Sequence, residues 1–171
     1  RLMERIYTRF GLQFSFVDSR DIRNIEAALR PETRMIYCET PTNPMMQLTD
    51  VAAMGDLTRA HGHLFVVDNT FATPMNQNPL ALGADLVIHS ATKFLGGHAD
   101  AMGGALCGRR ELVRAVYHFR EINGATLDPM SAYLLLRGMK TLDLRIERQN
   151  ASALTIARWL ERQPHVSQVN Y

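Results

Sequence analysis

Cysteine is scarce in this sequence, because Cys38 and Cys107 are the only two among 171 residues. Both lie in strand-like apolar runs, which predicts reduced core residues and no disulfide, a usage typical of a cytoplasmic enzyme. No apolar run reaches the roughly 18 residues of a membrane-spanning helix, and no signal peptide is evident. These absences argue against a disulfide-stapled secreted protein and against an integral membrane protein.

An excess of charge of one sign is also lacking. The chain carries 19 basic and 17 acidic residues, for a formal net charge of +2, and they are scattered. Such a balance favours neither a nucleic acid nor an acidic membrane surface as partner. Hydrophobic residues at 46% and charged residues at 21% are typical of a globular protein with its own core.

The expected elements alternate in the order of an α/β protein with a mostly parallel sheet flanked by helices. Apolar runs predict strands at 33–38, 63–67, 85–89 and 101–107, with two further short strand candidates at 14–17 and 166–171. Helical spacing, capping residues and breakers predict helices at 2–10, 21–29, 50–60, from 110, at 129–136, and from 141 to before Pro164.

The most informative stretch is Ser90-Ala91-Thr92-Lys93, which directly follows the apolar run 85–89. It places a lysine and two hydroxyl groups at the exit of a buried strand. A phosphate at such an exit gains backbone N–H donors as well as hydroxyls, so Ser90 and Thr92 are candidate phosphate ligands. Burial or a neighbouring positive charge lowers the pKa of a lysine and makes its amine a nucleophile, which is the role we expect for Lys93.

Asp68 ends the preceding apolar run and is the second candidate site residue. If the two strands are parallel neighbours, the Asp68 carboxylate and the Lys93 amine lie in one crevice at the carboxyl edge of the sheet, where open α/β sheets bind ligands. A third strand exit carries Asn43, whose amide could donate to a ring oxygen in that crevice. Glu39 could orient this amide, although a structural role in the loop is the simpler interpretation.

A carboxylate, a lysine and a pair of hydroxyls together suit pyridoxal phosphate, which is held as a Schiff base with an acidic partner on its pyridinium nitrogen. No metal is expected. The histidines and acids at 61–63 and 98–100 lack third and fourth ligands at a familiar spacing.

Three segments carry a resemblance to a known family: residues 39–44 (ETPTNP), 66–71 (VVDNTF) and 89–98 (HSATKFLGGH). In this order and spacing the sequence resembles the Cys/Met-metabolism family of pyridoxal-phosphate enzymes, which includes cystathionine γ-synthase, cystathionine and methionine γ-lyases and the O-acylhomoserine sulfhydrylases. The helix junction at 135–142 (LLRGMKTL) is similar too.

The resemblance implies the large domain of a fold-type I, aminotransferase-like transferase, in a homotetramer built from dimers. It implies that Lys93 carries the cofactor and moves protons, that Asp68 pairs with the pyridine nitrogen, that Ser90 and Thr92 hold the phosphate, and that Asn43 lies near the ring hydroxyl. The implied reaction is β- or γ-elimination, or γ-replacement, on a sulfur amino acid or an activated homoserine. Residues 96–100 and 124–128 favour γ chemistry.

Several features of the family have no counterpart in these 171 residues. They are the N-terminal arm, the Gly-rich phosphate turn, the tyrosine that stacks on the ring, and the C-terminal domain with its carboxylate-binding arginine. We therefore expect residues 1–163 to be part of the cofactor-binding domain and 164–171 to begin a C-terminal domain. Alone, this piece is expected to be inactive.

Two other interpretations remain open. One is a catalytically incompetent fragment that serves as an assembly or interaction module. The other is an aldolase that uses Lys93 as a Schiff-base lysine without a cofactor, although the strand–helix order does not suggest the usual barrel of such enzymes.

Overall fold

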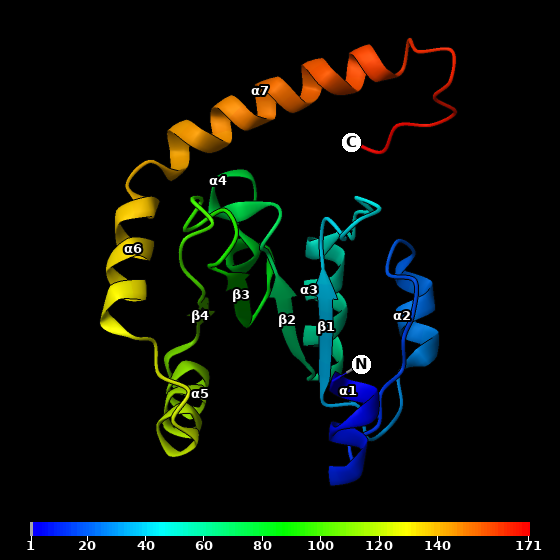
Figure 1. Cartoon of the computed structure of the whole chain (residues 1–171). Coiled ribbons are helices and arrows are strands. Elements are labelled where there is room, and N and C mark those ends of the chain that lie inside the picture. The colour runs from blue at the N-terminus through cyan, green and yellow to red at the C-terminus, as the bar shows by residue number, and fades with distance from the viewer. Residues whose placement is uncertain (1) are drawn as a thin grey trace.

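The computed structural model describes residues 2–171, which form a four-stranded sheet with helices around it (Figure 1). The strands are β1 (Met35–Glu39), β2 (Leu64–Asp68), β3 (Leu86–Ser90) and β4 (Gly104–Gly108). They lie in the order β1-β2-β3-β4, and the first three are parallel while β4 runs antiparallel to β3. The expected α/β architecture with a mostly parallel sheet is thus confirmed.

The helical elements largely follow the expected ranges. They are α1 (Leu2–Arg5), η1 (Tyr7–Phe10), α2 (Ile22–Ala28), α3 (Val51–His61), α4 (Thr73–Asn76), η2 (Pro79–Leu82), α5 (Arg110–Asn123), α6 (Pro129–Met139) and α7 (Leu142–Leu160). Asp21, Asp50 and Asp128 cap α2, α3 and α6 by accepting backbone N–H bonds. Among residues 2–171, none of the helices combines the length and the apolar character needed to cross a lipid bilayer.

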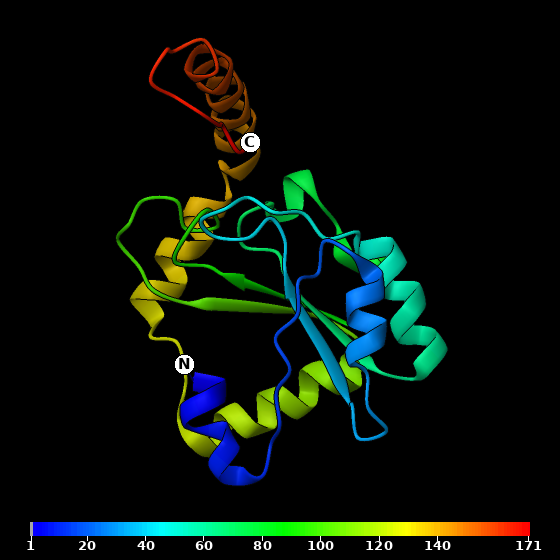
Figure 2. The same cartoon turned by 90° about the vertical axis from the view of Figure 1, so that its right-hand side faces the viewer.

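The main core lies between one face of the sheet and the helices α2 and α3, which Figures 1 and 2 show together on that face. Alternate strand residues supply it, including Ile36, Cys38, Phe65, Val67 and Val87. Because side chains alternate along a strand, Asp68 belongs to the opposite face, together with the half-exposed Tyr37 of the neighbouring β1.

A second, smaller core joins the segment after β3 to the helix pair α6 and α7. Its buried members are Ala91, Leu95, Leu135, Leu142 and Ile146. Beyond this contact, α7 extends away from the sheet, as Figure 2 shows. The second core therefore anchors the chain that carries Lys93 on a scaffold separate from the main core.

Two of the expected strands are absent from the described residues. Residues 14–17 and 166–171 are irregular, and Phe16 and Tyr171 are 67% and 61% exposed. A strand needs a partner for its backbone groups, and neither segment pairs with one here. The helix expected over 2–10 is also divided into α1 and η1, ending at Gly11 in the left-handed conformation (φ 80°). Arg1 lies outside the described residues.

The expectation that both cysteines are core residues is half right. Both are free thiols, but Cys38 is buried and Cys107 is exposed. Cys107 lies in β4, none of whose residues is fully buried, whereas the other edge strand, β1, contributes Ile36 and Cys38 to the main core. Burial, with a contribution from the Asp68 charge, raises the pKa of the Cys38 thiol to about 12, so this residue is an inert part of the core.

Candidate active site

The candidate site lies where β2 and β3 end side by side. Asp68 is the last residue of β2 and Ser90 the last of β3, and the two strands are parallel with Asp68 opposite Ile88. Parallel strands expose their carboxyl ends at one edge of the sheet, where α/β proteins bind ligands. Lys93 follows Ser90 by three residues, so the lysine and the carboxylate belong to the same edge.

Among residues 2–171, three hydrogen bonds hold the Asp68 carboxylate. The Thr70 backbone N–H and hydroxyl donate to Asp68 Oδ1 at 3.0 and 2.6 Å. The Tyr37 hydroxyl donates to Oδ2 at 3.2 Å. An ionised carboxylate has about four acceptor positions, so Asp68 retains the capacity for one more donor, on Oδ2.

The negative charge of Asp68 contributes to the pKa shifts of several neighbouring groups. Burial and the Asp68 carboxylate together raise the pKa of the Tyr37 phenol, which keeps it a hydrogen-bond donor. Burial and the same carboxylate also raise the pKa of Glu39, while a backbone hydrogen bond from Asn43 lowers it in part. That bond favours the structural interpretation of Glu39, as a residue that holds the loop carrying Asn43.

His89 lies on β3 and is 6% exposed. Burial lowers the pKa of its imidazole, although the Asp68 charge acts in the opposite direction. Its Nδ1 has no hydrogen-bond partner among the described residues. His89 is therefore a neutral, buried side chain beneath the end of β3.

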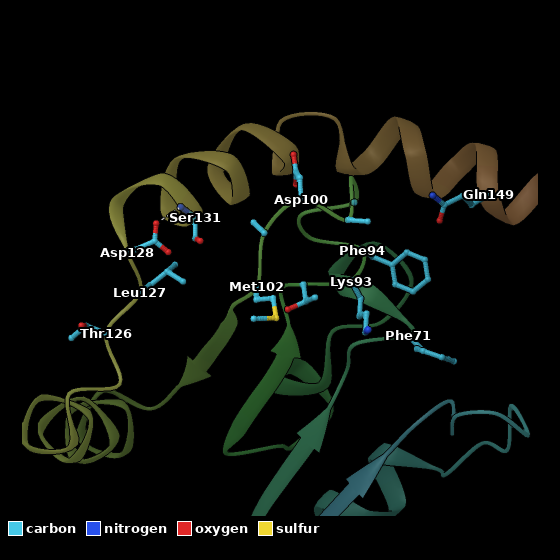
Figure 3. Close-up of a pocket in the computed structure, with 14 residues that line it drawn as sticks. Phe71, Lys93, Phe94, Asp100, Met102, Thr126, Leu127, Asp128, Ser131 and Gln149 are labelled. Carbon is cyan, nitrogen blue, oxygen red and sulfur yellow. Dashed lines mark hydrogen bonds between the residues drawn. The ribbon is translucent and has the colours of Figure 1, made fainter.

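A pocket of about 1030 Å³ opens beside Lys93. Figure 3 shows its wall, in which the Lys93 amine and the Phe71 ring lie on the same side. Fourteen residues line it: Phe71, Thr92, Lys93, Phe94, Gly97, Ala99, Asp100, Ala101, Met102, Thr126, Leu127, Asp128, Ser131 and Gln149. Of the predicted site residues, Lys93 and Thr92 line this pocket, whereas Asp68, Ser90 and Asn43 do not.

The Lys93 segment is a compact turn with its own backbone bonds. Lys93 N–H donates to the Ser90 carbonyl at 3.0 Å, and Gly97 N–H donates to the Lys93 carbonyl at 2.7 Å. Ala91 and Leu95 are buried on either side of it, which fixes the backbone while Lys93 itself is exposed. Burial, one of the two expected means of activating this amine, is therefore not supplied by the described residues.

Arg145 of α7 ties this turn to the helix pair. Its guanidinium donates to the Phe94 carbonyl at 2.9 Å and to the Gly138 carbonyl at 2.9 Å, and its Nε donates to the Thr141 hydroxyl at 3.1 Å. One side chain thus satisfies a carbonyl next to Lys93 and another at the end of α6. The turn and the helix pair are held as one unit.

Close backbone contact between Gly138 and Gly96 is the second tie, and it leads to a prediction. A methyl group on Gly138 would overlap the Gly96 carbonyl oxygen and approach the carbonyl carbon to 2.9 Å. Gly138→Ala should therefore destabilise the natural full-length protein by about 1–3 kcal/mol, measured as a lower urea midpoint. The matched control is Gly104→Ala, whose methyl would meet nothing closer than 3.7 Å. Equal midpoints for the two variants would contradict the prediction.

The remaining predicted ligands differ in their availability. Thr92 Oγ1 donates to the Gly103 carbonyl at 3.3 Å and accepts the Gly103 N–H at 3.0 Å, so its hydroxyl would have to turn to meet a phosphate. Ser90 is half-buried, and its backbone N–H donates to the Thr70 hydroxyl. Asn43 is exposed, in a loop with cis peptide bonds before Pro41 and Pro44.

Three residues at the site were not predicted from the sequence. Thr70 and Tyr37 bind Asp68, and Arg145 binds the Lys93 turn. Thr70 could have been found, because an Asp-x-Thr at a strand end is a common local hydrogen-bond arrangement. Tyr37 and Arg145 lie 31 and more than 50 residues from their partners, and no local signal connects them. Within residues 2–171, no group of three acids, histidines or cysteines could hold a metal ion.

The chain is similar to known proteins over nearly its whole length. The O-succinylhomoserine sulfhydrylase of Pseudomonas aeruginosa is 44% identical over 99% of the chain, and the cystathionine gamma-lyase of Bacillus subtilis is 44% identical over 100%. A crystal structure of cystathionine gamma-lyase from Lactobacillus plantarum, complexed with L-serine, superimposes with a TM-score of 0.97 at 42% identity over the whole chain.

The chain spans less than half the length of these relatives, namely 42%, 45% and 45% of them. The family model described as Cys/Met metabolism PLP-dependent enzyme matches residues 1–171. The expected fold-type and the resemblance carried by the three motif segments are thereby confirmed. The chain belongs to the Cys/Met metabolism family of pyridoxal-phosphate-dependent enzymes.

Proposed function

We propose that the natural full-length protein is a pyridoxal-phosphate-dependent lyase or transferase that breaks or makes a carbon–sulfur bond in a sulfur amino acid or an activated homoserine. The observation that carries the proposal is the position of Lys93 in the pocket wall, at the same sheet edge as an Asp68 carboxylate with one acceptor position left. Two of the relatives named above are cystathionine gamma-lyases by name, which favours γ chemistry over β-elimination.

The residues of the site fit the cofactor. Lys93 offers an exposed amine for its aldehyde carbon, and Asp68 offers an oxygen for its protonated pyridine nitrogen. Ser90 and Thr92 would hold the phosphate and Asn43 the ring hydroxyl. When bound, pyridoxal phosphate withdraws electrons from the carbon atoms of an attached amino acid. Lys93 would then carry protons on its Nζ, and Asp68 would keep the ring nitrogen protonated.

Reductive trapping tests the proposal. Incubation of the full-length protein with pyridoxal phosphate and then borohydride should leave a stable adduct on Lys93, located by peptide mass. Lys140, the only other lysine of this chain, is exposed and serves as an internal control, because it should stay unmodified. Assays with cystathionine, methionine and O-acylhomoserines then identify the substrate.

Each other outcome has a meaning. Absence of an adduct would overturn the proposal and favour an assembly module. Trapping with a carbonyl substrate and no pyridoxal phosphate would favour an aldolase. The homotetramer and the cytoplasmic location remain predictions from the sequence, and the amino-acid substrate follows from the proposed chemistry.

A further inference from the structure

Thr70 connects the two strand ends of the candidate site. It lies two residues after Asp68, is 9% exposed, and uses both its backbone N–H and its hydroxyl on Asp68 Oδ1. The hydroxyl contact, at 2.6 Å, is the shortest of the three hydrogen bonds to Asp68. A hydroxyl bond to a carboxylate at this distance is of the stronger, charge-assisted kind.

The direction of the Thr70 hydroxyl is set by β3. Ser90 N–H donates to Thr70 Oγ1 at 2.8 Å, and a backbone N–H can only donate. The hydroxyl has one proton, which is then directed to Asp68. A chain of two hydrogen bonds therefore runs from the backbone at the end of β3, through Thr70, to the carboxylate at the end of β2.

We propose that Thr70 is a positioning residue that fixes the Asp68 carboxylate so that the free acceptor position of Oδ2 faces the pyridine nitrogen of the cofactor. The inference rests on the proposed function. Because the same threonine also bonds the backbone of Ser90, it sets the carboxylate in register with the segment that leads to Lys93. Neither Thr70 nor Ser90 is among the residues that line the pocket.

The test compares Thr70→Val with Thr70→Ser in the full-length protein. Valine keeps the shape but removes the hydroxyl, whereas serine keeps the hydroxyl. We expect the dissociation constant of pyridoxal phosphate, measured by fluorescence titration, to rise roughly 10-fold or more in Thr70→Val, the effect of losing one hydrogen bond to a charged group. In Thr70→Ser it should stay within about 3-fold of the unmodified protein. Thr58→Val, which removes another buried hydroxyl, in α3, should not change it.

Two further readouts separate positioning from general damage. In a double-mutant cycle, Thr70→Val should have no further effect on cofactor affinity once Asp68→Ala is present, because its action passes through Asp68. In the cofactor-free protein, the Ser90 amide should exchange with solvent faster in Thr70→Val than in Thr70→Ser, since it has lost its acceptor.

The inference is overturned if Thr70→Val binds the cofactor normally, if serine fails to restore affinity, or if the losses from Thr70→Val and Asp68→Ala simply add. Failure of the proposed function would look different. The unmodified protein would then give no borohydride adduct on Lys93, while the exchange of the Ser90 amide would still report whether the hydrogen-bond chain exists.

Discussion

Lys93→Ala is expected to abolish turnover of the sulfur amino acid substrate by the full-length protein, lowering kcat/KM by more than roughly 1000-fold. The reason is that the proposed role of Lys93 has two parts, because its amine would both bind the aldehyde of the cofactor and move protons at the substrate. Alanine removes both functions. Because Lys93 is exposed and its turn is fixed by Ala91, Leu95 and the backbone, the loss of the side chain should leave the fold intact.

Lys140→Ala is the matched control for this experiment. Lys140 is also exposed and follows α6 directly, but it does not line the pocket. We expect its kcat/KM to stay within about 2-fold of the unmodified protein, as for most surface substitutions. Turnover by Lys93→Ala at the normal rate would remove the role assigned to this lysine, and circular dichroism would show whether a lost activity reflects lost structure.

The strand ends of the site could be predicted because their signals are local. An apolar run that stops at a single acid places Asp68 at the end of β2, and the run 85–89 places Ser90 at the end of β3. That β2 and β3 are parallel neighbours follows from the helical segment and turns between them. Together these two facts bring the carboxylate and the lysine to one sheet edge.

The hydrogen bonds that tune the site could not be predicted, because they depend on side-chain direction across the fold. Tyr37 reaches Asp68 only because β1 and β2 pair in a register that puts both on one face. Arg145 reaches the Phe94 carbonyl only because α7 leaves α6 at the Gly138–Gly96 contact. A shift of one residue in the register of β1 would move Tyr37 to the other face of the sheet.

The absence of the two strands that the sequence favours has a related cause. Residues 14–17 and 166–171 pair with no strand among the described residues, and Phe16 and Tyr171 are exposed, so the local strand preference has no sheet to join. Cys107 likewise lies in an apolar run, but in a strand none of whose residues is fully buried. The hydrophobic pattern of the sequence indicates which side chains can be buried, and the elements packed around them determine whether they are.

Asp68→Asn should be the second most damaging substitution, with turnover reduced by at least roughly 100-fold. The asparagine keeps the shape of the side chain but loses the charge that, in the proposed function, keeps the pyridine nitrogen protonated, so a hydrogen bond between two charged groups would become a weaker neutral one. Steady-state kinetics of the full-length protein measure the loss. Asp56→Asn is a suitable control, because Asp56 is exposed on α3 and its ion-pair partner among residues 2–171 is Arg59.

The same variant has a readout that needs neither cofactor nor substrate. Burial raises the pKa of Tyr37, and the negative Asp68 carboxylate raises it further because it disfavours the phenolate. Removing the charge in Asp68→Asn should therefore lower the pKa of Tyr37, and tyrosinate absorbance should appear at lower pH than in the unmodified protein. Tyr37→Phe, made in both backgrounds, identifies the signal. If the titration of Tyr37 did not move, the carboxylate could not lie where the 3.2 Å hydrogen bond places it, and the assignment of Asp68 to the site would fail with it.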